Sequence, residues 1–183
     1  MKLILLRHEE RYSDIGFFSN LTDNGVINSC LLANELIKYD IDIVFSSPFI
    51  RTLQTIYPYM VKNNYTKKIN CEYGLYEYIH NPYFMLGNWY YTIDNIEDND
   101  LKSIININYD SVVNKSDFNI LESEVDIEIR IRKFFNYLFA TFPNKNILIV
   151  SHRGVINKIK DIYIKKTDME DEFPMGHLEV FTL

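Results

Sequence analysis

Short apolar runs alternate with longer amphipathic segments along the chain of 183 residues. Strands buried on both faces read as continuous apolar stretches, whereas helices repeat their apolar positions about three to four residues apart. The apolar stretches predict strands over residues 3–7, 42–46, 68–72, 147–151 and 178–183. The helical spacing predicts helices over residues 22–39, 48–61, 122–142 and 154–163.

Polar residues and prolines mark the starts of these predicted helices. Thr22 suits the N-cap of the first helix, and Pro48 fits the first turn of the second. Residues 122–126 open the third helix with a pattern like a capping box. The positions expected to form the apolar face of the first helix are Val26, Cys30, Ala33 and Ile37.

Strands and helices alternate along most of the chain. This alternation is typical of a mostly parallel sheet with helices on both faces. We therefore expect an α/β fold, a three-layer sandwich, in a single domain over residues 1–183. Residues 74–119 are aromatic, acidic and rich in asparagine without a sustained period, and we interpret them as an insertion or cap.

Composition and charge narrow the possible partners. The formal net charge of -6 argues against general nucleic-acid binding, which relies on a basic surface. No stretch approaches the roughly 20 apolar residues of a membrane span, and Arg7 interrupts the apolar start too early for a secretory signal. We expect a cytoplasmic protein that binds neither nucleic acid nor membrane. The oligomeric state stays open.

The cysteines give no sign of a covalent framework. Cys30 and Cys71 are too few and too far apart for a set of disulfides or a paired metal motif. Both stand among apolar residues, so we interpret them as small buried hydrophobic side chains.

Two of the predicted strands end in histidine and arginine. Arg7 and His8 close the first strand, and His152 and Arg153 follow the fourth. In open α/β sheets the ligand crevice lies outside the carboxyl ends of the strands, so these ends suggest one anion site. Arg51, in the first turn of the second helix, is placed to join it. The plainer alternative, a solvent-exposed arginine, suits Arg153 better than Arg7.

The residue types at these ends favour phosphate chemistry. Arginine forks and imidazole donors can stabilise a transferring phosphoryl group without a metal. A neutral imidazole, with an ordinary pKa of about 6.5, is also a competent nucleophile. His8 beside Arg7 is placed for that role. A lone histidine is more often structural, so the interpretation depends on the pattern around it.

Further motifs extend this pattern through the chain. They are Leu5-Leu6-Arg7-His8, Leu21-Thr22-x-x-Gly25, Ser46-Ser47-Pro48-x-x-Arg51-Thr52-x-Gln54-Thr55, Gly74-Leu75-x-Glu77, Glu122-Ser123 and Val150-Ser151-His152-x-Gly154-Val155-Ile156. Together they resemble the motifs of the histidine phosphatase superfamily, the phosphoglycerate mutase-like group. They stand in the family's order over residues 3–156, so the resemblance covers nearly the whole chain apart from the middle insertion.

The resemblance implies a role for each matching residue. His8 would be the phosphorylated nucleophile, with Arg7 and Arg51 as phosphate clamps. His152 would be a further donor to the phosphoryl oxygens. Glu77 would protonate the leaving group and then activate water, although a solvated loop glutamate is the plainer alternative. The resemblance implies no metal and no other cofactor.

Residues next to His8 and His152 qualify the resemblance. Arg7-His8-Glu9-Glu10-Arg11 is similar to the Arg-His-Gly-Glu-Arg signature of one branch, whose second arginine joins the phosphate pocket. Arg11 is therefore a second candidate, evenly balanced against a surface arginine paired with Glu10. Glu9 and Arg153 stand where the family usually has glycine. Glu9 must point away from the pocket or tune His8, and Arg153 either contacts phosphate or decorates the surface.

Other polar and aromatic residues carry less information. His80 and His177 belong to no motif, and we expect a loop residue and a strand-start residue. The aromatic residues between 83 and 91 either line a pocket for the leaving group or belong to the core. The acids expected to form a solvated edge are Asp94, Glu97, Asp98 and Asp100.

The combined pattern indicates a metal-independent phosphatase. It would hydrolyse a small phosphomonoester through a phosphohistidine at His8, with a phosphoprotein as the second choice of substrate. One alternative is a cofactor-dependent phosphoglycerate mutase, which shares the motifs. The other is a non-catalytic, phosphate-binding regulatory module, for which Glu9 is the sole argument. The sequence does not identify the phosphorylated substrate.

Overall fold

A computed structural model describes residues 1–14, 16–62, 64, 68–82, 91–117, 121–164 and 173–183. Within these residues five strands form one sheet in the order β3-β2-β4-β1-β5. The strands are β1 (Lys2–Arg7), β2 (Ile43–Ser46), β3 (Asn70–Cys71), β4 (Asn146–Ser151) and β5 (Leu178–Thr182). β5 pairs antiparallel with β1 at one edge, and every other pairing is parallel. The predicted, mostly parallel sheet is confirmed.

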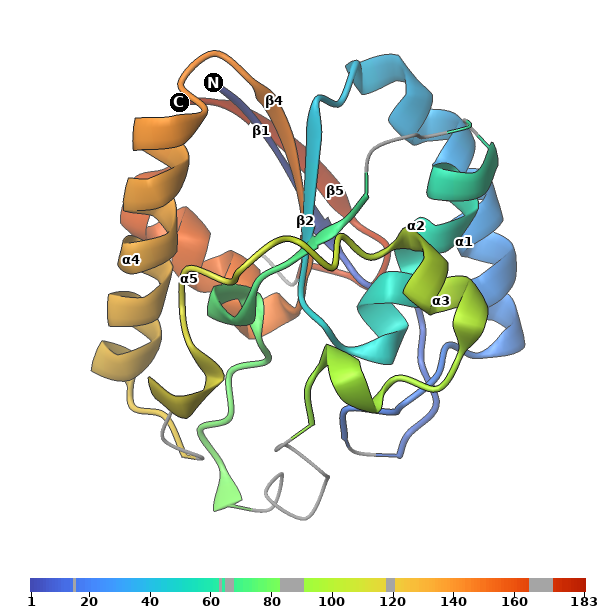
Figure 1. Cartoon of the computed structure of the whole chain (residues 1–183), viewed down its shortest axis with the longest axis horizontal. Helices are drawn as coiled ribbons and strands as arrows, with labels where there is room; N and C mark the ends of the chain where they lie inside the picture. The colour runs from blue at the N-terminus through green and yellow to red at the C-terminus, as the bar shows by residue number, and fades with distance from the viewer. Residues whose placement is uncertain (15, 63, 65–67, 83–90, 118–120, 165–172) are drawn as a thin grey trace.

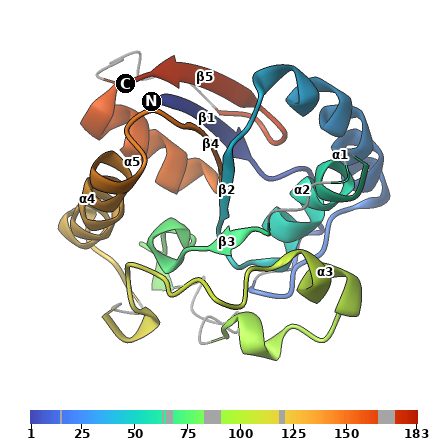
Figure 2. The ribbon, with the colours of Figure 1, turned by 45° about the horizontal axis from the view of Figure 1, so that its top comes forward.

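Helices cover both faces of this sheet. α1 (Asp23–Leu36) and α2 (Ile50–Lys62) lie on one side, and α4 (Glu124–Thr141) and α5 (Arg153–Tyr163) lie on the other (Figure 1). The short helix α3 (Asn99–Ile104) packs beside α2 (Figure 2). Shorter 3-10 turns occupy Ile37–Tyr39, Tyr73–Leu75, Ile93–Asn95 and Lys115–Asp117. The three-layer α/β sandwich is therefore confirmed, and no helix among the described residues is long and apolar enough to cross a bilayer.

The alternating sides of β1 explain why its sequence is apolar throughout. Ile4 and Leu6 belong to the core under α1 and α2, whereas Leu3 and Leu5 belong to the core under α4 and α5. All four side chains are fully buried. A strand that is covered on both faces has no polar position, so the run reads as continuous.

The predicted caps of α1 and α4 are confirmed, whereas Pro48 precedes α2 and does not lie in its first turn. The Thr22 hydroxyl accepts the Gly25 N–H at 3.0 Å. Ser123 and Asp126 cap each other reciprocally at the start of α4. α2 begins at Ile50, two residues after Pro48, and continues through Pro58. These side-chain bonds satisfy backbone N–H groups that the first turn of a helix leaves without partners.

The predicted apolar face of α1 is wrong. Val26, Cys30 and Ile37 are exposed, and only Ala33 of the expected four is buried. The buried residues of α1 are Gly25, Ser29, Leu32, Ala33 and Leu36. Gly25 sets this face, because a Cβ there would lie 2.1 Å from the Glu10 carbonyl oxygen. The interpretation of Cys30 as buried is therefore wrong, whereas Cys71 is buried as predicted.

Parts of the segment 74–119 pack along the β3 edge of the sheet. The Ile69 N–H donates to the Ile104 carbonyl at 2.8 Å, and the Asn106 N–H donates to the Ile69 carbonyl at 2.9 Å. The predicted solvated edge of acids is confirmed, because all four acids between 94 and 100 are exposed. Of the aromatic residues between 83 and 91, only Tyr91 lies within the described residues, and it packs 4.5 Å from the Phe18 ring.

Candidate active site

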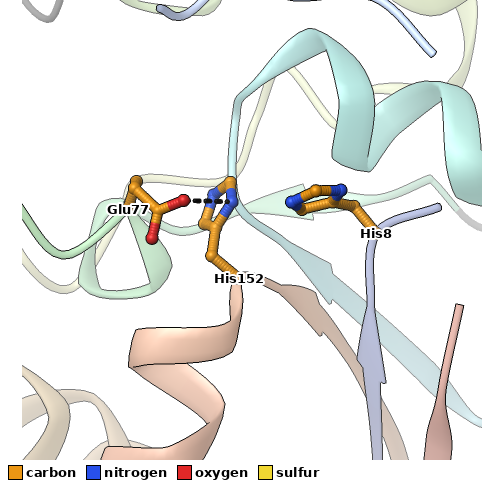
Figure 3. A group of neighbouring side chains, drawn as sticks. All are labelled: His8, Glu77 and His152. Carbon is orange, nitrogen blue, oxygen red and sulfur yellow. Dashed lines mark ion pairs between the residues drawn. The ribbon is translucent and has the colours of Figure 1, made fainter. Parts of the chain in front are cut away.

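The carboxyl ends of β1 and β4 lie side by side and carry the two predicted histidines. Arg7 pairs in register with Ser151, and the His8 N–H donates to the Ser151 carbonyl at 3.0 Å. His152 follows as the N-cap residue of α5. The ring centroids of His8 and His152 are 5.3 Å apart, and Figure 3 shows the His152 ring between Glu77 and the His8 ring. The parallel register therefore joins residues that are 144 positions apart in the sequence.

His8 is held as a neutral imidazole with one free nitrogen. Its Nδ1 lies 2.7 Å from the Glu9 carbonyl oxygen, which can only accept, so Nδ1 carries the proton. Nε2 keeps its lone pair. Burial lowers the pKa of His8 well below 6.5, and the positive charge of Arg51 adds to that effect. His8 is therefore an uncharged imidazole whose lone pair is on Nε2.

His152 is fully buried and contacts the side chains of Ser47, Glu77 and Arg51. Its Nε2 lies 2.9 Å from the Ser47 hydroxyl, and its Nδ1 lies 3.2 Å from Glu77 Oε2. Burial lowers the pKa of His152 to about 4, against the opposing effect of the Glu77 carboxylate. The ring is therefore neutral at pH 7 and oriented by a serine that sequence reasoning did not single out.

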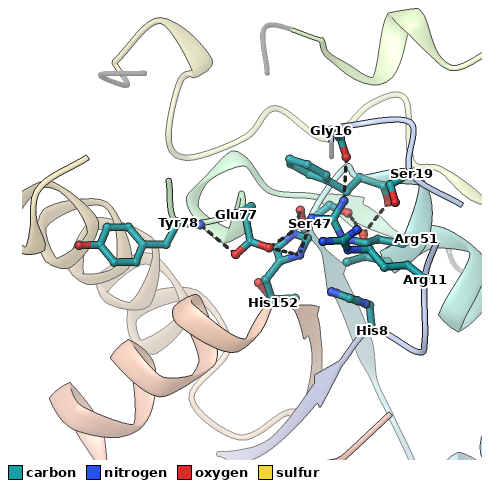
Figure 4. A network of polar contacts seen from close by, with 12 residues as sticks. His8, Arg11, Gly16, Ser19, Ser47, Arg51, Glu77, Tyr78 and His152 are labelled. Atoms are coloured by element: carbon teal, nitrogen blue, oxygen red, sulfur yellow. Dashed lines mark hydrogen bonds and ion pairs between the residues drawn. The ribbon is translucent and has the colours of Figure 1, made fainter. Parts of the chain in front are cut away.

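Arg51 lies in the first turn of α2 and is 2% exposed. Its guanidinium donates to the Gly16 carbonyl at 2.9 Å and to Glu77 Oε2 at 3.2 Å (Figure 4). Burial lowers the pKa of Arg51 to about 10, which leaves it protonated at pH 7. Its Nε is buried without a hydrogen-bond partner among the described residues. A buried donor of this kind favours an anion as its missing acceptor.

Glu77 follows the 3-10 turn Tyr73–Leu75 and is ionised in this arrangement. Burial alone raises the pKa of a carboxyl group, but the neighbouring His152 and Arg51 outweigh burial and hold the pKa of Glu77 well below its usual range. Its Oε1 also accepts the Tyr78 N–H at 3.2 Å. At neutral pH the Glu77 carboxylate can therefore accept a proton but has none to donate.

Arg7 and Arg11 complete the cationic side of the site. An Nη of Arg7 donates to the Phe173 carbonyl at 2.6 Å. Arg11 donates to the carbonyls of Tyr12 at 2.6 Å and Asp14 at 2.7 Å. The alternative prediction was that Arg11 pairs with Glu10, but the Glu10 carboxylate accepts the Thr22 hydroxyl at 2.9 Å. Both arginines thus donate to backbone carbonyls at the edge of the site.

These side chains surround a cavity of about 220 Å³. Its lining residues are Arg7, His8, Arg11, Gly16, Arg51, Glu77, Tyr78, Ile79, His80, Arg153 and Gly154. All the sequence-predicted site residues line it except His152, which contacts Arg51 and Glu77 directly behind the wall. Sequence reasoning missed the lining role of residues 78–80, although they directly follow Glu77. The side chain of His177 is not part of this lining and pairs with Glu179 at 3.2 Å, although its carbonyl accepts the Arg7 N–H.

Glu9 points away from this cavity. Its N–H donates to the Thr55 hydroxyl at 2.9 Å, and it is absent from the residues that line the cavity. Its carboxylate fills the space beside Gly176, where a Cβ would lie 2.2 Å from Glu9 Oε1. Of the two predicted possibilities for Glu9, the structure therefore has the one that leaves the pocket open.

His8, Glu77 and His152 are also the described residues that could hold a metal ion. Their potential ligand atoms all lie within 4.8 Å of one another. However, a guanidinium nitrogen of Arg51 lies 3.2 Å from both His152 Nδ1 and Glu77 Oε2. A fixed positive charge at that distance opposes a cation and favours an anion.

A comparison with sequence models of protein families identifies one family. The sequence model of the histidine phosphatase superfamily (branch 1) matches residues 8–177. A comparison with curated proteins finds no match.

Solved structures share the fold at low sequence identity. The chain is similar to the ecdysone phosphate phosphatase of Bombix mori in complex with tungstate (16% identity, TM-score 0.69, covering 100% of this chain and 89% of that chain). It is also similar to a putative alpha-ribazole-5'-P phosphatase of Escherichia coli (19%, 0.69, 100% and 91%). A third is the phosphoserine phosphatase of Entamoeba histolytica in complex with 3-phosphoglyceric acid (20%, 0.63, 99% and 90%).

Proposed function

Because the chain belongs to the histidine phosphatase superfamily (branch 1), we propose that it hydrolyses a small phosphomonoester through a phosphohistidine at His8. The observation that carries this proposal is the state of His8. Its Nδ1 proton is held by the Glu9 carbonyl, so the free Nε2 lone pair is available in a cavity lined by arginines. The similar solved structures include phosphatases, which supports hydrolysis as the reaction.

The phosphate group would bind between Arg7, Arg11 and Arg51. Burial and the nearby positive charge of Arg11 both lower the pKa of Arg51, which indicates that the two guanidinium groups lie within electrostatic reach of each other. A phosphate oxygen is the acceptor that the buried Nε of Arg51 lacks. Guanidinium groups at fixed positions stabilise the charge that spreads over the phosphoryl oxygens during transfer.

In the first step the Nε2 lone pair of His8 forms a bond to phosphorus while the bond from phosphorus to the leaving oxygen breaks. The electron pair of that bond goes to the leaving oxygen. The imidazole then carries a positive charge, because Nδ1 keeps its proton. The Glu9 carbonyl, 2.7 Å from Nδ1, stabilises this charged ring.

Glu77 would supply the proton that the leaving oxygen needs. It is ionised in the empty site, where His152 and Arg51 hold its pKa well below the usual range against the effect of burial. A bound phosphate dianion draws Arg51 toward itself and adds negative charge beside the carboxylate, and both changes raise the pKa of Glu77. Substrate binding thus protonates Glu77 and converts it into the general acid.

In the second step water attacks phosphorus and releases inorganic phosphate. Glu77, ionised after the first step, accepts a proton from the attacking water. The bond from Nε2 to phosphorus breaks, and its electron pair returns to His8. His8 is then neutral again, and Glu77 releases the proton that it took up on substrate binding when inorganic phosphate leaves, so the net reaction is hydrolysis of the ester.

The test is turnover of an aryl phosphate in excess chelator by the wild type, His8→Ala and His177→Ala. We expect chelator-resistant activity in the wild type and a loss of at least about a thousandfold in His8→Ala. His177→Ala is the matched control, because His177 is an exposed histidine outside the cavity and its loss should leave turnover unchanged. Rapid quenching in alkali, which phosphohistidine survives, should trap the phosphoenzyme in the wild type and in His177→Ala but not in His8→Ala.

Three results would overturn the proposal. They are full activity in His8→Ala, activity abolished by the chelator, and transfer of the trapped phosphoryl group back to a phosphoglycerate in preference to water. The last result would identify a mutase. Wild-type protein that binds an aryl phosphate but never turns it over would identify a non-catalytic module.

A further inference from the structure

The outer side of α1 exposes a contiguous group of apolar side chains. Val26, Ile27 and Leu31 on this helix and Ile37 directly after it are each between 47% and 63% exposed. The exposed thiol of Cys30 lies among them. Figures 1 and 2 show α1 on the outside of its layer, with α2 beside it. Single exposed apolar residues are ordinary on a monomer, but a contiguous group of them indicates a binding surface.

Helical spacing places these residues on one strip of α1. Positions three or four apart share a face of a helix, and Ile27, Cys30 and Leu31 follow that spacing. Leu32 and Leu36 lie on the opposite side, in the core under α1 and α2. The helix is therefore apolar on two sides, and only the side with Leu32 and Leu36 is buried in the structure.

The exposed strip has opposite charges at its two ends. Asp23 begins α1, and Lys38 lies in the 3-10 turn that follows it. Both are exposed, and neither has an ion-pair partner among the described residues. Glu35 is the remaining charge of residues 23–39, and Lys62 of α2 reaches the same side by donating to Asn34 Oδ1 at 2.5 Å. This side is thus neutral overall, although the whole chain has a net charge of -6.

Two-fold symmetry makes this strip complementary to itself. If two copies of α1 lie antiparallel, Asp23 of each copy faces Lys38 of the other, whereas a parallel arrangement brings like charges together. The point midway between Asp23 and Lys38 falls between Cys30 and Leu31. We propose that the exposed strip of α1 is a dimer interface, where a second copy of this chain packs antiparallel across a two-fold axis between Cys30 and Leu31.

The length of α1 limits the strength of this dimer. Its 14 residues make a helix about 21 Å long. One pair of such helices gives an interface at the small end of specific interfaces, so we expect a reversible dimer with a dissociation constant on the order of 10 to 100 µM. The described residues that line the cavity lie outside α1, so this inference does not depend on the proposed function.

The first test is the mass of the full chain in solution. Sedimentation equilibrium between about 5 and about 500 µM compares the wild type, Ile27→Glu and Ile129→Glu. Ile129 is the matched control, because it is 61% exposed on α4, against 58% for Ile27 on α1. A melting midpoint at the lowest concentration shows whether each variant is folded.

We expect the mass of the wild type and of Ile129→Glu to rise with concentration from 21.8 kDa toward twice that value. Ile27→Glu places two carboxylates near the axis without partners, so its dissociation constant should rise at least about tenfold. A wild type that stays monomeric at the highest concentration would overturn the inference. So would Ile27→Glu that dimerises as strongly as the wild type.

Exchanging the end charges tests the antiparallel arrangement. Asp23→Lys and Lys38→Glu each bring like charges together at both ends, so each should weaken the dimer at least about threefold at low salt. The double variant restores opposite charges and should dimerise within about twofold of the wild type. A mixture of the two single variants should associate more strongly than either alone. A double variant as weak as the single ones would overturn the proposed arrangement.

The reactivity of Cys30 tests the interface without any substitution. Cys71 is buried, and burial raises its pKa to about 12, so a maleimide reacts first with Cys30. We expect the rate constant for labelling Cys30 to fall at least about threefold as the wild type becomes dimeric, but to stay constant in Ile27→Glu. A rate constant that does not change while the wild type dimerises would place the interface elsewhere and overturn the inference.

Discussion

The two sides of the cavity are held in place by different means. His8 and His152 stand at the ends of adjacent parallel strands, where the backbone ladder itself fixes them. Glu77 and the cavity-lining residues 78–80 lie in a loop that follows β3, a strand of only two residues, Asn70–Cys71. Parallel strands impose a register on whatever follows them, whereas a loop keeps its shape only through its side chains.

The buried carboxylate of Glu72 fixes the loop that leads to Glu77 by hydrogen bonds. Glu72 is fully buried, and five donors lie within 3.2 Å of its carboxylate. The donors are the N–H groups of Gly74, Val112 and Val113 and the hydroxyls of Tyr109 and Ser111. Arg130, which is paired with Glu122, also donates to the Gly74 carbonyl at 2.7 Å. Polar anchors thus hold the segment that carries Glu77.

The largest of three further effects is expected from Arg51→Lys, in the first turn of α2. A lysine keeps the charge but loses the fork that reaches Gly16 and Glu77 together. We expect kcat/KM for an aryl phosphate to fall by about a thousandfold. Arg132→Lys, on the exposed face of α4, is the control and should be silent. A variant that retains a third of wild-type activity would contradict the role of Arg51 as a clamp.

The next effect is expected from Glu72→Ala, on the side held by side chains. Its removal leaves five buried or partly buried donors without their acceptor, so we expect a loss of about 3 kcal/mol in the free energy of unfolding. Urea denaturation measures it, with Glu128→Ala as the exposed glutamate control. We also expect kcat to fall while binding of inorganic phosphate is kept. Unchanged stability would show that the loop does not depend on this carboxylate.

The smallest effect is a pH dependence of stability from the buried histidine His152. Its folded pKa is about 4, below the ordinary 6.5, so the unfolded chain takes up a proton more readily. Stability is therefore complete above pH 6.5 and decreases as the pH falls toward 4. Between pH 7.5 and pH 5 the wild type should lose about 2 kcal/mol more than His152→Asn. Urea midpoints at the two pH values measure this, and equal losses would contradict a neutral buried ring.

The sequence predicted the elements fixed by the sheet better than those held by side chains. The run Leu3–Leu6 is apolar because it is covered on both faces, and that property is visible without a structure. The strand end then places Arg7 and His8 without further information. The buried face of α1 was not predictable from hydrophobicity, because Gly25 and Ser29 form it through close backbone approach.

The loop residues of the site were harder to foresee for the same physical reason. Glu77 came from a motif, but nothing local indicates that Tyr78 and His80 line the cavity. Their positions depend on Glu72, which contacts residues about 40 positions away in the sequence. Ser47 likewise reaches His152 only in the folded protein, across 105 positions. Neither the hydrophobic periodicity of a segment nor its amino-acid composition reveals such long-range polar contacts.

The fit of Glu9 against Gly176 limits the order in which this protein could change during evolution. Gly176 has a left-handed φ of 71°, and a Cβ there would overlap the Glu9 carboxylate. A larger residue at 176 is therefore accessible only after Glu9 has become smaller. A return of Glu9 to glycine would empty the space first. The two positions should thus covary among descendants of this chain, and a larger residue at 176 beside an unchanged Glu9 should be selected against.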